Sequence, residues 1–161
     1  FFQDFLLFDF LNQGFGNHML RINENETMLV GEELAKEFLE LELDRSIVIF
    51  LQGELGAGKT TLTKGILKGL NYDEVVTSPT YNLVQIHETE NYKVFHFDLY
   101  RISEPIELEE LGIEEYLNEN RSLSIFEWPK NGEENLPSPD YLIEISYKEN
   151  GENDNRKLTI S

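Results

Sequence analysis

The feature that most constrains the fold is an eight-residue stretch, GELGAGKT, at Gly53–Thr60. Its glycines let the backbone adopt conformations with φ > 0 and point successive N–H groups inward, which makes a concave site for an anion. Lys59 adds a positive charge, and the hydroxyl of Thr60 can bind a magnesium ion that bridges two phosphates. A helix that begins here presents its positive dipole end to the same anion. The stretch predicts a phosphate-binding loop for a nucleotide triphosphate.

The residues on either side of the loop have the pattern that such a loop requires. Ile47–Leu51 is a continuous apolar run, which is typical of a strand buried on both faces. After the loop, Leu62, Ile66, Leu67 and Leu70 are spaced as on one face of a helix. The alternative is a glycine-rich turn without a ligand, and the order strand, loop, helix favours the phosphate-binding interpretation.

Composition limits the classes of protein to which the chain can belong. Its 161 residues are 40% hydrophobic, enough for one ordinary core, so we expect a single domain. Without cysteine it has no disulfide or thiolate zinc site, and no apolar run is long enough to span a bilayer. The formal net charge of −18 disfavours direct, tight nucleic-acid binding but suits a partner with a basic surface.

The first 18 residues differ from the rest of the chain. They are rich in phenylalanine, and they lack the basic segment and cleavage site of a signal peptide. We expect residues 1–18 to be a leader that is non-native or unstructured, and residues 19–161 to form the domain that carries the loop. The alternative is that the phenylalanines pack onto a partner or onto the core.

The remaining pattern indicates an α/β domain. Helices are expected through Gly31–Leu39 and, as one or two short amphipathic helices, within residues 106–119. Further strands are expected at Leu20–Ile22, Tyr81–Ile86, Tyr92–Leu99, Leu123–Phe126, Tyr141–Tyr147 and Arg156–Ile160. Since adjacent strands with short connections pair antiparallel, we expect a three-layer, P-loop NTPase-like α/β domain with a mixed parallel and antiparallel central sheet.

Two acids follow apolar strands and are candidates to complete the site. Asp98 is predicted to hold magnesium together with Thr60, provided that its strand runs parallel to the strand before the loop. The alternative for Asp98 is capping of the next turn. Glu127 is predicted to orient or deprotonate an attacking water, or to bind the metal through water. The alternative for Glu127 is a structural ion pair, for example with Arg101.

Other candidates are less specific. Trp128 is either a core aromatic or a ring at the rim of the nucleotide or partner site, and its residue type does not decide between them. Ser78 and Thr80 flank a proline in a loop that can sense the γ-phosphate, or in an ordinary turn before a strand. His96 alternates with phenylalanines, which favours a packed or hydrogen-bonded histidine over a proton carrier.

Four segments together resemble the TsaE (YjeE) family, the P-loop ATPase of bacterial tRNA threonylcarbamoyladenosine (t6A) synthesis. They are Gly53–Thr61, Ser78–Val84, His96–Arg101 and Glu127–Pro129. The likeness covers about Leu20 to Ile160 in order, and Glu107–Ile113 resembles the acidic helix of the family. The phenylalanine-rich leader has no counterpart in the family.

The resemblance implies a small cytoplasmic ATPase, monomeric when alone, that uses ATP and Mg²⁺. It would assist a TsaB–TsaD complex in threonylcarbamoylation of adenosine 37 in ANN-decoding tRNAs, and would meet tRNA only indirectly. It implies catalytic roles for Lys59, Glu127 and Trp128, and metal binding by Thr60, Asp98 and Glu127. The implied nucleotide contacts are Gly53, Glu54, Leu55, Gly56, Ala57, Gly58, Lys59, Thr60, Thr61, Ser78, Thr80 and Thr27.

Two other functions share the loop. A small-molecule kinase usually has a lid with arginines, and only Arg101 and Arg121 lie between the loop and Glu127. A binding module can switch with nucleotide while hydrolysing little of it. A GTPase is disfavoured, because neither an N-K-x-D guanine reader nor a D-x-x-G switch is present.

Overall fold

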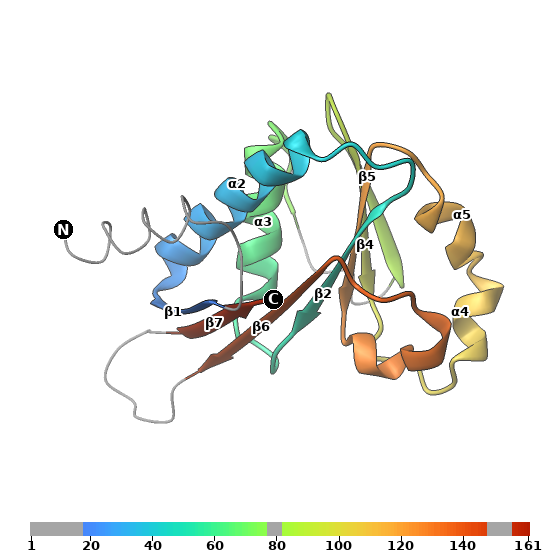
Figure 1. Ribbon diagram of the computed structural model, residues 1–161. Coiled ribbons are helices and arrows are strands. Elements are labelled where there is room, and N and C mark those ends of the chain that lie inside the picture. The colour runs from blue at the N-terminus through green and yellow to red at the C-terminus, as the bar shows by residue number, and fades with distance from the viewer. Residues whose placement is uncertain (1–17, 77–81, 148–155) are drawn as a thin grey trace.

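The computed structural model describes residues 18–76, 82–147 and 156–161, in which seven strands form one sheet (Figure 1). The strands are β1 (His18–Ile22), β2 (Ile47–Gln52), β3 (Val84–Glu88), β4 (Lys93–Asp98), β5 (Ser122–Glu127), β6 (Tyr141–Tyr147) and β7 (Arg156–Ile160). The helices are α2 (Glu24–Glu40), α3 (Lys59–Gly69), α4 (Ile106–Glu110) and α5 (Ile113–Leu117), with 3-10 turns η1 (Pro129–Asn131) and η2 (Glu133–Asn135). The predicted leader, apart from His18, and the turn of the terminal hairpin lie outside the described residues. Within them, no helix combines the length and apolar character needed to cross a membrane.

The sheet has the strand order β1-β7-β6-β2-β5-β4-β3. β2 pairs in parallel with β5 on one side and with β6 on the other, and β4 is parallel to β5. β3 pairs antiparallel with β4, while β7 lies antiparallel between β6 and β1. The predicted mixed sheet, its two antiparallel hairpins and the parallel orientation required of β4 are therefore confirmed.

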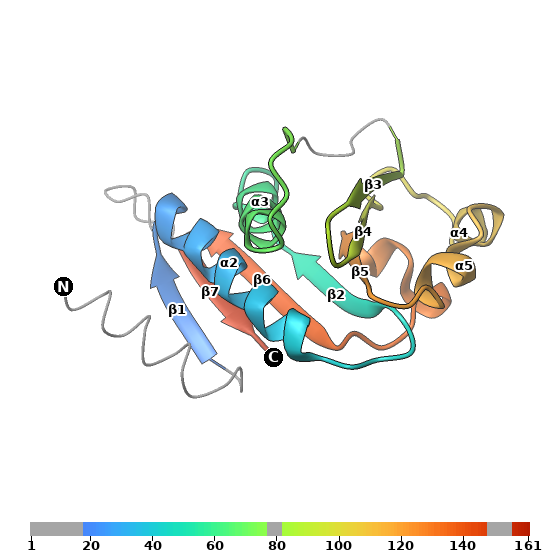
Figure 2. The same cartoon turned by 90° about the horizontal axis from the view of Figure 1, so that it is seen from above.

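Helices cover both faces of the sheet, which gives three layers (Figures 1 and 2). On one face, Ile49 and Leu51 of β2 belong to a core shared with α2 and α3. On the other face, Val48 belongs to a core shared with α4, α5 and β4. β2 is buried from both sides, as its apolar run predicted.

Helix α2 begins at Glu24, seven residues before the predicted segment at Gly31. Its start is fixed by a capping box, in which the Asn23 side chain accepts the Glu26 N–H at 2.9 Å and the Glu26 carboxylate accepts the Asn23 N–H at 3.2 Å. These two bonds satisfy N–H groups that have no partner within the helix. The cap places the first turn of α2 directly after β1.

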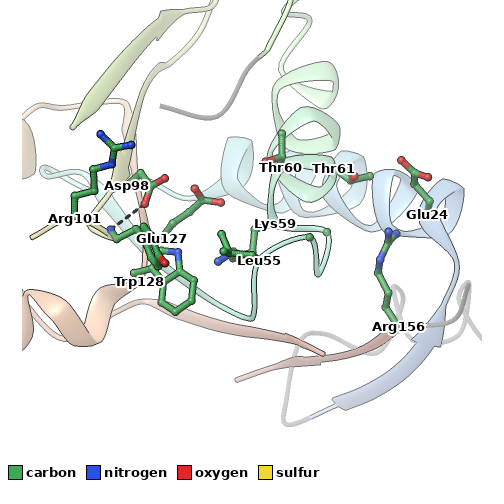
Figure 3. A pocket seen from close by; sticks show the side chains of 13 residues that line it. Glu24, Leu55, Lys59, Thr60, Thr61, Asp98, Arg101, Glu127, Trp128 and Arg156 are labelled. Carbon is green, nitrogen blue, oxygen red and sulfur yellow. Dashed lines mark hydrogen bonds between the residues drawn. The ribbon is translucent and has the colours of Figure 1, made fainter. Parts of the chain in front are cut away.

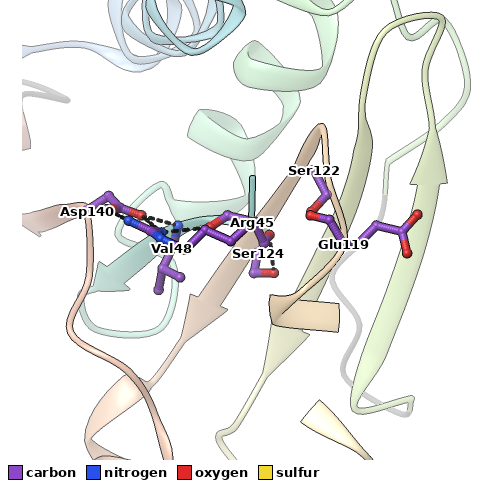
Figure 4. Close-up of polar contacts among 7 residues, drawn as sticks. Arg45, Val48, Glu119, Ser122, Ser124 and Asp140 are labelled. Carbon is purple, nitrogen blue, oxygen red and sulfur yellow. Dashed lines mark hydrogen bonds and ion pairs between the residues drawn. The ribbon is translucent and has the colours of Figure 1, made fainter. Parts of the chain in front are cut away.

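A polar cluster fixes the start of β6 beside β2, at the ends of these strands that lie away from the loop (Figure 4). The Asp140 carboxylate accepts two hydrogen bonds from the Arg45 guanidinium and one from the Val48 N–H, each 2.8 Å long. Burial acts to raise the pKa of Asp140, but these hydrogen bonds outweigh it and hold the pKa below its ordinary value. Nearby, the Ser46 and Ser124 hydroxyls lie 2.7 Å apart and link the residue before β2 to β5.

Helices α2 and α3 cross so closely that a side chain does not fit at Gly65. A Cβ atom placed on Gly65 would lie 2.2 Å from the carbonyl oxygen of Met28 and 3.0 Å from its carbonyl carbon. Both are backbone atoms, so the clash can be relieved only by moving one helix away from the other.

We therefore expect Gly65→Ala to lower the free energy of unfolding by about 1–3 kcal/mol, although alanine favours helices over glycine. Urea unfolding would measure this loss. Lys64→Ala, at an exposed position of the same helix, is the matched control and should change stability little. A Gly65→Ala variant as stable as the wild type would contradict the close packing of the two helices.

Candidate functional site

The pairing of three parallel strands brings the loop and both predicted acids together at the carboxyl ends of those strands. Asp98 at the end of β4 pairs with Glu127 at the end of β5, and Glu127 pairs with Leu51 at the end of β2. β2 leads directly into the loop, so the loop and both acids meet where the strands end. Open α/β sheets form their ligand sites at these carboxyl ends of the strands.

The loop turns through two glycines with positive φ, Gly56 at 76° and Gly58 at 114°, before α3 begins at Lys59. Such angles disfavour any residue with a Cβ. The Lys59 ammonium donates to the Gly53 carbonyl at 2.7 Å and lies 4.1 Å from the ring centroid of Trp128. Trp128 itself has a φ of 55°, in the left-handed region that non-glycine residues seldom occupy. Lys59 thus lies between its own loop and the ring of Trp128. The backbone of Trp128 is strained.

A pocket of about 490 Å³ opens between the loop and the strand ends (Figure 3). Its size falls within the range typical of small-molecule sites. Its lining residues are Glu24, Leu55, Gly56, Gly58, Lys59, Thr60, Thr61, Asp98, Tyr100, Arg101, Glu127, Trp128 and Arg156. The pocket therefore joins the glycine loop, the magnesium candidates and the turnover candidates in one space.

Both acids are held by neighbouring groups. Asp98 is 9% exposed, and its Oδ1 accepts the Tyr100 N–H at 3.0 Å, so it also makes the turn cap considered as its alternative role. Glu127 is 3% exposed, and its Oε2 lies 3.5 Å from Nε2 of the fully buried His96. Neither ring nitrogen of His96 makes a hydrogen bond in the part of the chain that the structure describes. His96 is thus a packed histidine behind Glu127.

The pKa shifts show a site whose charges are costly to bury. Burial raises the pKa of the Asp98 carboxyl, the charge of Glu127 acts in the same direction, and the Tyr100 N–H opposes both. Burial lowers the pKa of the Lys59 ammonium, and the charges of Glu127 and Asp98 partly offset this effect. Burial disfavours the charged form of each group, so a bound cation and a bound anion would both relieve the site.

The residues present suit a metal ion that takes some of its ligands from a nucleotide. Among residues 18–76, 82–147 and 156–161, no group of three or more His, Cys, Asp or Glu could hold a metal ion by itself. Mg²⁺ is usually bound by one or two carboxylates together with substrate phosphates and water. Asp98 and the hydroxyl of Thr60, which line the same pocket, fit that pattern.

Some predicted nucleotide-binding residues do not line the pocket. Ala57 is fully buried, Gly53 and Glu54 line a separate pocket together with residues of β6 and β7, and Ser78 and Thr80 lie outside the described residues. Thr27 is fully buried in α2, where its hydroxyl donates to the Asn23 carbonyl at 2.8 Å. Direct contact between Thr27 and a ligand would require the start of α2 to move, so its role stays a prediction.

The structure also brings in residues that sequence reasoning did not assign to the site. Glu24 comes from the first turn of α2, Tyr100 and Arg101 from the turn after β4, and Arg156 from the start of β7. Arg156 reaches the pocket because the predicted β6–β7 hairpin lies beside β2 in the sheet, and no local pattern predicts that position. Glu24 could have been found from the Asn23 cap signal, which places the start of a helix directly after the first strand.

Similar proteins show the family and the fold of this chain. The family model described as threonylcarbamoyl adenosine biosynthesis protein TsaE matches residues 22–158. The chain belongs to the TsaE family. A TsaE relative from Haemophilus influenzae is 40% identical over 131 residues, covering 81% of this chain and 82% of the relative. The TsaE relative from Bacillus subtilis is 36% identical over 114 residues, covering 71% and 68% of the two chains.

A solved structure supports the same fold for this TsaE-family chain. The crystal structure of YdiB from Bacillus subtilis superposes with a TM-score of 0.68 and 27% sequence identity, covering 91% of this chain and 87% of YdiB. The fold is that of P-loop NTPase-like proteins, as the sequence predicted. Both the resemblance and the fold class expected from the sequence are therefore confirmed.

The raised pKa of Asp98 leads to a prediction about stability without ligand. Between the ordinary carboxyl pKa of about 3.9 and the raised folded-state pKa, the folded protein binds more protons than the unfolded chain. The free energy of unfolding therefore falls as pH rises through that window, and the loss is complete above the folded-state pKa. Asp98→Asn should thus stabilise the nucleotide-free protein at pH 7.

The gain from Asp98→Asn should shrink as the pH is lowered through that window, because Asp98 is then protonated in the wild type as well. Urea unfolding across this pH range would measure it, with Asp44→Asn at an exposed position as the control. If Asp98→Asn lowers stability at pH 7, the account of an electrostatically costly site is wrong.

Proposed function

We propose that this protein is a Mg²⁺-dependent ATPase that assists threonylcarbamoylation of adenosine 37 in ANN-decoding tRNAs. The observation that carries the proposal is the register of β4 and β5, which sets Asp98 and Glu127 side by side facing the glycine loop. Family membership supports the pathway, since the Haemophilus relative is named a tRNA threonylcarbamoyladenosine biosynthesis protein. A triphosphate between the loop and these acids would meet amides, an ammonium and two carboxylates in one pocket.

Binding begins at the loop. The N–H groups around Gly56 and Gly58 and the start of α3 hold the phosphates. Lys59 then exchanges its bond to the Gly53 carbonyl for a phosphate oxygen, which restores a strong partner to a partly desolvated ammonium. Thr60 and Asp98 would hold Mg²⁺, which would neutralise charge that develops on the phosphates during transfer.

Glu127 orients the attacking water or accepts its proton. The carboxylate is buried, lines the pocket and has His96 behind it, so its position is fixed before the nucleotide arrives. The Trp128 ring lines the pocket next to the Lys59 ammonium, where it would limit the access of bulk water. Arg101, which lines the same pocket, adds positive charge at the end of the cavity beside Asp98 (Figure 3).

Partners follow from charge. The net charge of −18 repels a tRNA backbone, so contact with tRNA is proposed to be indirect, through a TsaB–TsaD complex that holds the RNA in the cytoplasm. A basic surface on such a complex would be attracted to this protein. Turnover is expected to be slow without the partner, because many P-loop enzymes await a group from another protein to complete the site.

Glu127→Gln tests the chemistry. The amide keeps the shape but cannot take a proton, so phosphate release at saturating ATP should fall by about a hundredfold while ATP binding is kept. Glu110→Gln, at an exposed position on α4, is the control. Unchanged hydrolysis in Glu127→Gln removes Glu127 from the mechanism, and phosphate passing to an added metabolite would indicate a kinase.

Thr60→Ala tests the metal site. Loss of the hydroxyl should raise the Mg²⁺ concentration that gives half-maximal ATP hydrolysis by about tenfold. Thr60→Ser keeps the hydroxyl and should behave like the wild type. An unchanged Mg²⁺ dependence in Thr60→Ala would show that the hydroxyl does not bind the metal.

A further inference from the structure

Arg156, the first residue of β7, is a buried cation with incomplete bonding. Its residue is 6% exposed, and its Nη2 donates to the Tyr147 hydroxyl at 3.3 Å. Its Nε and Nη1 have no hydrogen-bond partner in the part of the chain that the structure describes. A guanidinium always carries its charge, and burying its donors without acceptors is unfavourable. The arginine therefore has unused capacity to bind an anion.

The sheet holds Arg156 against the phosphate-binding loop. Arg156 pairs with Tyr147 on one side and with Ile22 on the other, and all three lie at the strand ends near the loop. The Tyr147 hydroxyl donates to the Gly56 carbonyl, and the Arg156 guanidinium carbon lies 5.4 Å from the Tyr147 ring centroid. Loop, tyrosine and arginine form one connected unit.

The contact with the loop occurs at the glycine that precedes α3. A Cβ atom placed on Gly58 would lie 3.1 Å from Cδ and 3.2 Å from Nε of Arg156. Gly58 belongs to the loop that would enclose the phosphates, so the guanidinium is next to that cradle. Glycine at this position thus permits both the left-handed turn and the approach of the arginine.

The local charge is favourable for a polyphosphate. The chain as a whole has 13 Lys and Arg against 31 Asp and Glu. The lining of this pocket, by contrast, contains the cations Lys59, Arg101 and Arg156 together with three acids. Arg156 contributes one of the three positive charges that reduce the repulsion which the rest of the surface exerts on ATP.

The position of Arg156 indicates which part of a nucleotide it meets. Figure 3 shows Asp98 and Glu127 at one end of the pocket, and Arg156 at the other end beyond Thr61. The acids and Lys59 mark the end for the terminal phosphate and its metal. The opposite end is left for the α-phosphate, which ADP and ATP share.

We propose that Arg156 binds the α-phosphate of the nucleotide and so anchors ADP and ATP alike. This inference rests on the proposed function, in which the loop binds ATP. The guanidinium suits a phosphate because its Nε and Nη1 have no partner among the described residues and can donate to phosphate oxygens. Its side chain lines the pocket and turns toward the ligand to make them.

The test compares affinity for two nucleotides. Arg156→Gln should weaken the binding of both ADP and ATP, measured by calorimetry with Mg²⁺, about tenfold and by the same factor. Arg156→Lys keeps the charge but loses the planar set of guanidinium donors, so its affinities should lie between those of the wild type and those of Arg156→Gln. Lys157→Gln, at the exposed neighbouring position, should bind like the wild type. Thermal unfolding of each variant checks that it folds, and Arg156→Lys carries the test if Arg156→Gln does not fold.

Three results would overturn the inference. Equal affinities in the wild type and the Arg156 variants would remove the contact. A loss for ATP alone, or a loss of turnover with ADP affinity unchanged, would assign Arg156 to the terminal phosphate instead. A wild type that binds neither nucleotide would overturn the proposed function as well, which separates that failure from the first two.

Discussion

The site depends on the parallel pairing of β2 with β5 and of β5 with β4. These ladders end together, so the residues that follow or close each strand are neighbours although the sequence separates them widely. The glycine loop after β2 faces Asp98 and Glu127 for this reason alone. The Asp140 cluster, at the other ends of the strands, fixes β6 beside β2. β6 pairs with β7, which brings Arg156 to the end of the sheet where the loop lies.

Burial of charge connects the architecture to the chemistry. Lys59, Asp98 and Glu127 are each at most 9% exposed, and the pKa shifts of Lys59 and Asp98 record the cost of that burial. Without a ligand, Lys59 uses the Gly53 carbonyl and the Trp128 ring as substitutes. These are weaker partners than a phosphate, so the site can still gain electrostatic stabilisation from the metal-bound triphosphate that we propose as its ligand.

Much of the fold could be predicted from local pattern. The apolar run of β2, the glycine loop and the spacing of α3 predicted strand, turn and helix in order, and the short polar connections predicted both hairpins. The start of α2 was missed because the first turn contributes few apolar residues, and the Asn23 cap that sets it was not used. Thr27 was assigned from resemblance, yet its hydroxyl is bonded inside the helix.

Arg156 lay beyond local reasoning for a different reason. Its place in the site is set by the order of strands β1, β7 and β6, which brings the start of β7 next to a loop about a hundred residues earlier. Residue type and spacing predicted the pairing of β6 with β7, but they do not give the place of that hairpin in the sheet, beside β2 and β1. Pairings between distant segments were therefore the part of the site that the sequence did not provide.

The fluorescence of Trp128 tests the central claim most directly, because it is the single tryptophan in the chain and its ring lies 4.1 Å from the Lys59 ammonium. If the loop and the strand ends enclose one triphosphate, ATP with Mg²⁺ must draw Lys59 away from the ring. The account predicts a saturable change in Trp128 emission on addition of ATP. ADP should compete with ATP for the site, and Lys59→Ala should abolish the change. Unchanged emission at ATP concentrations that calorimetry shows to be bound would contradict it.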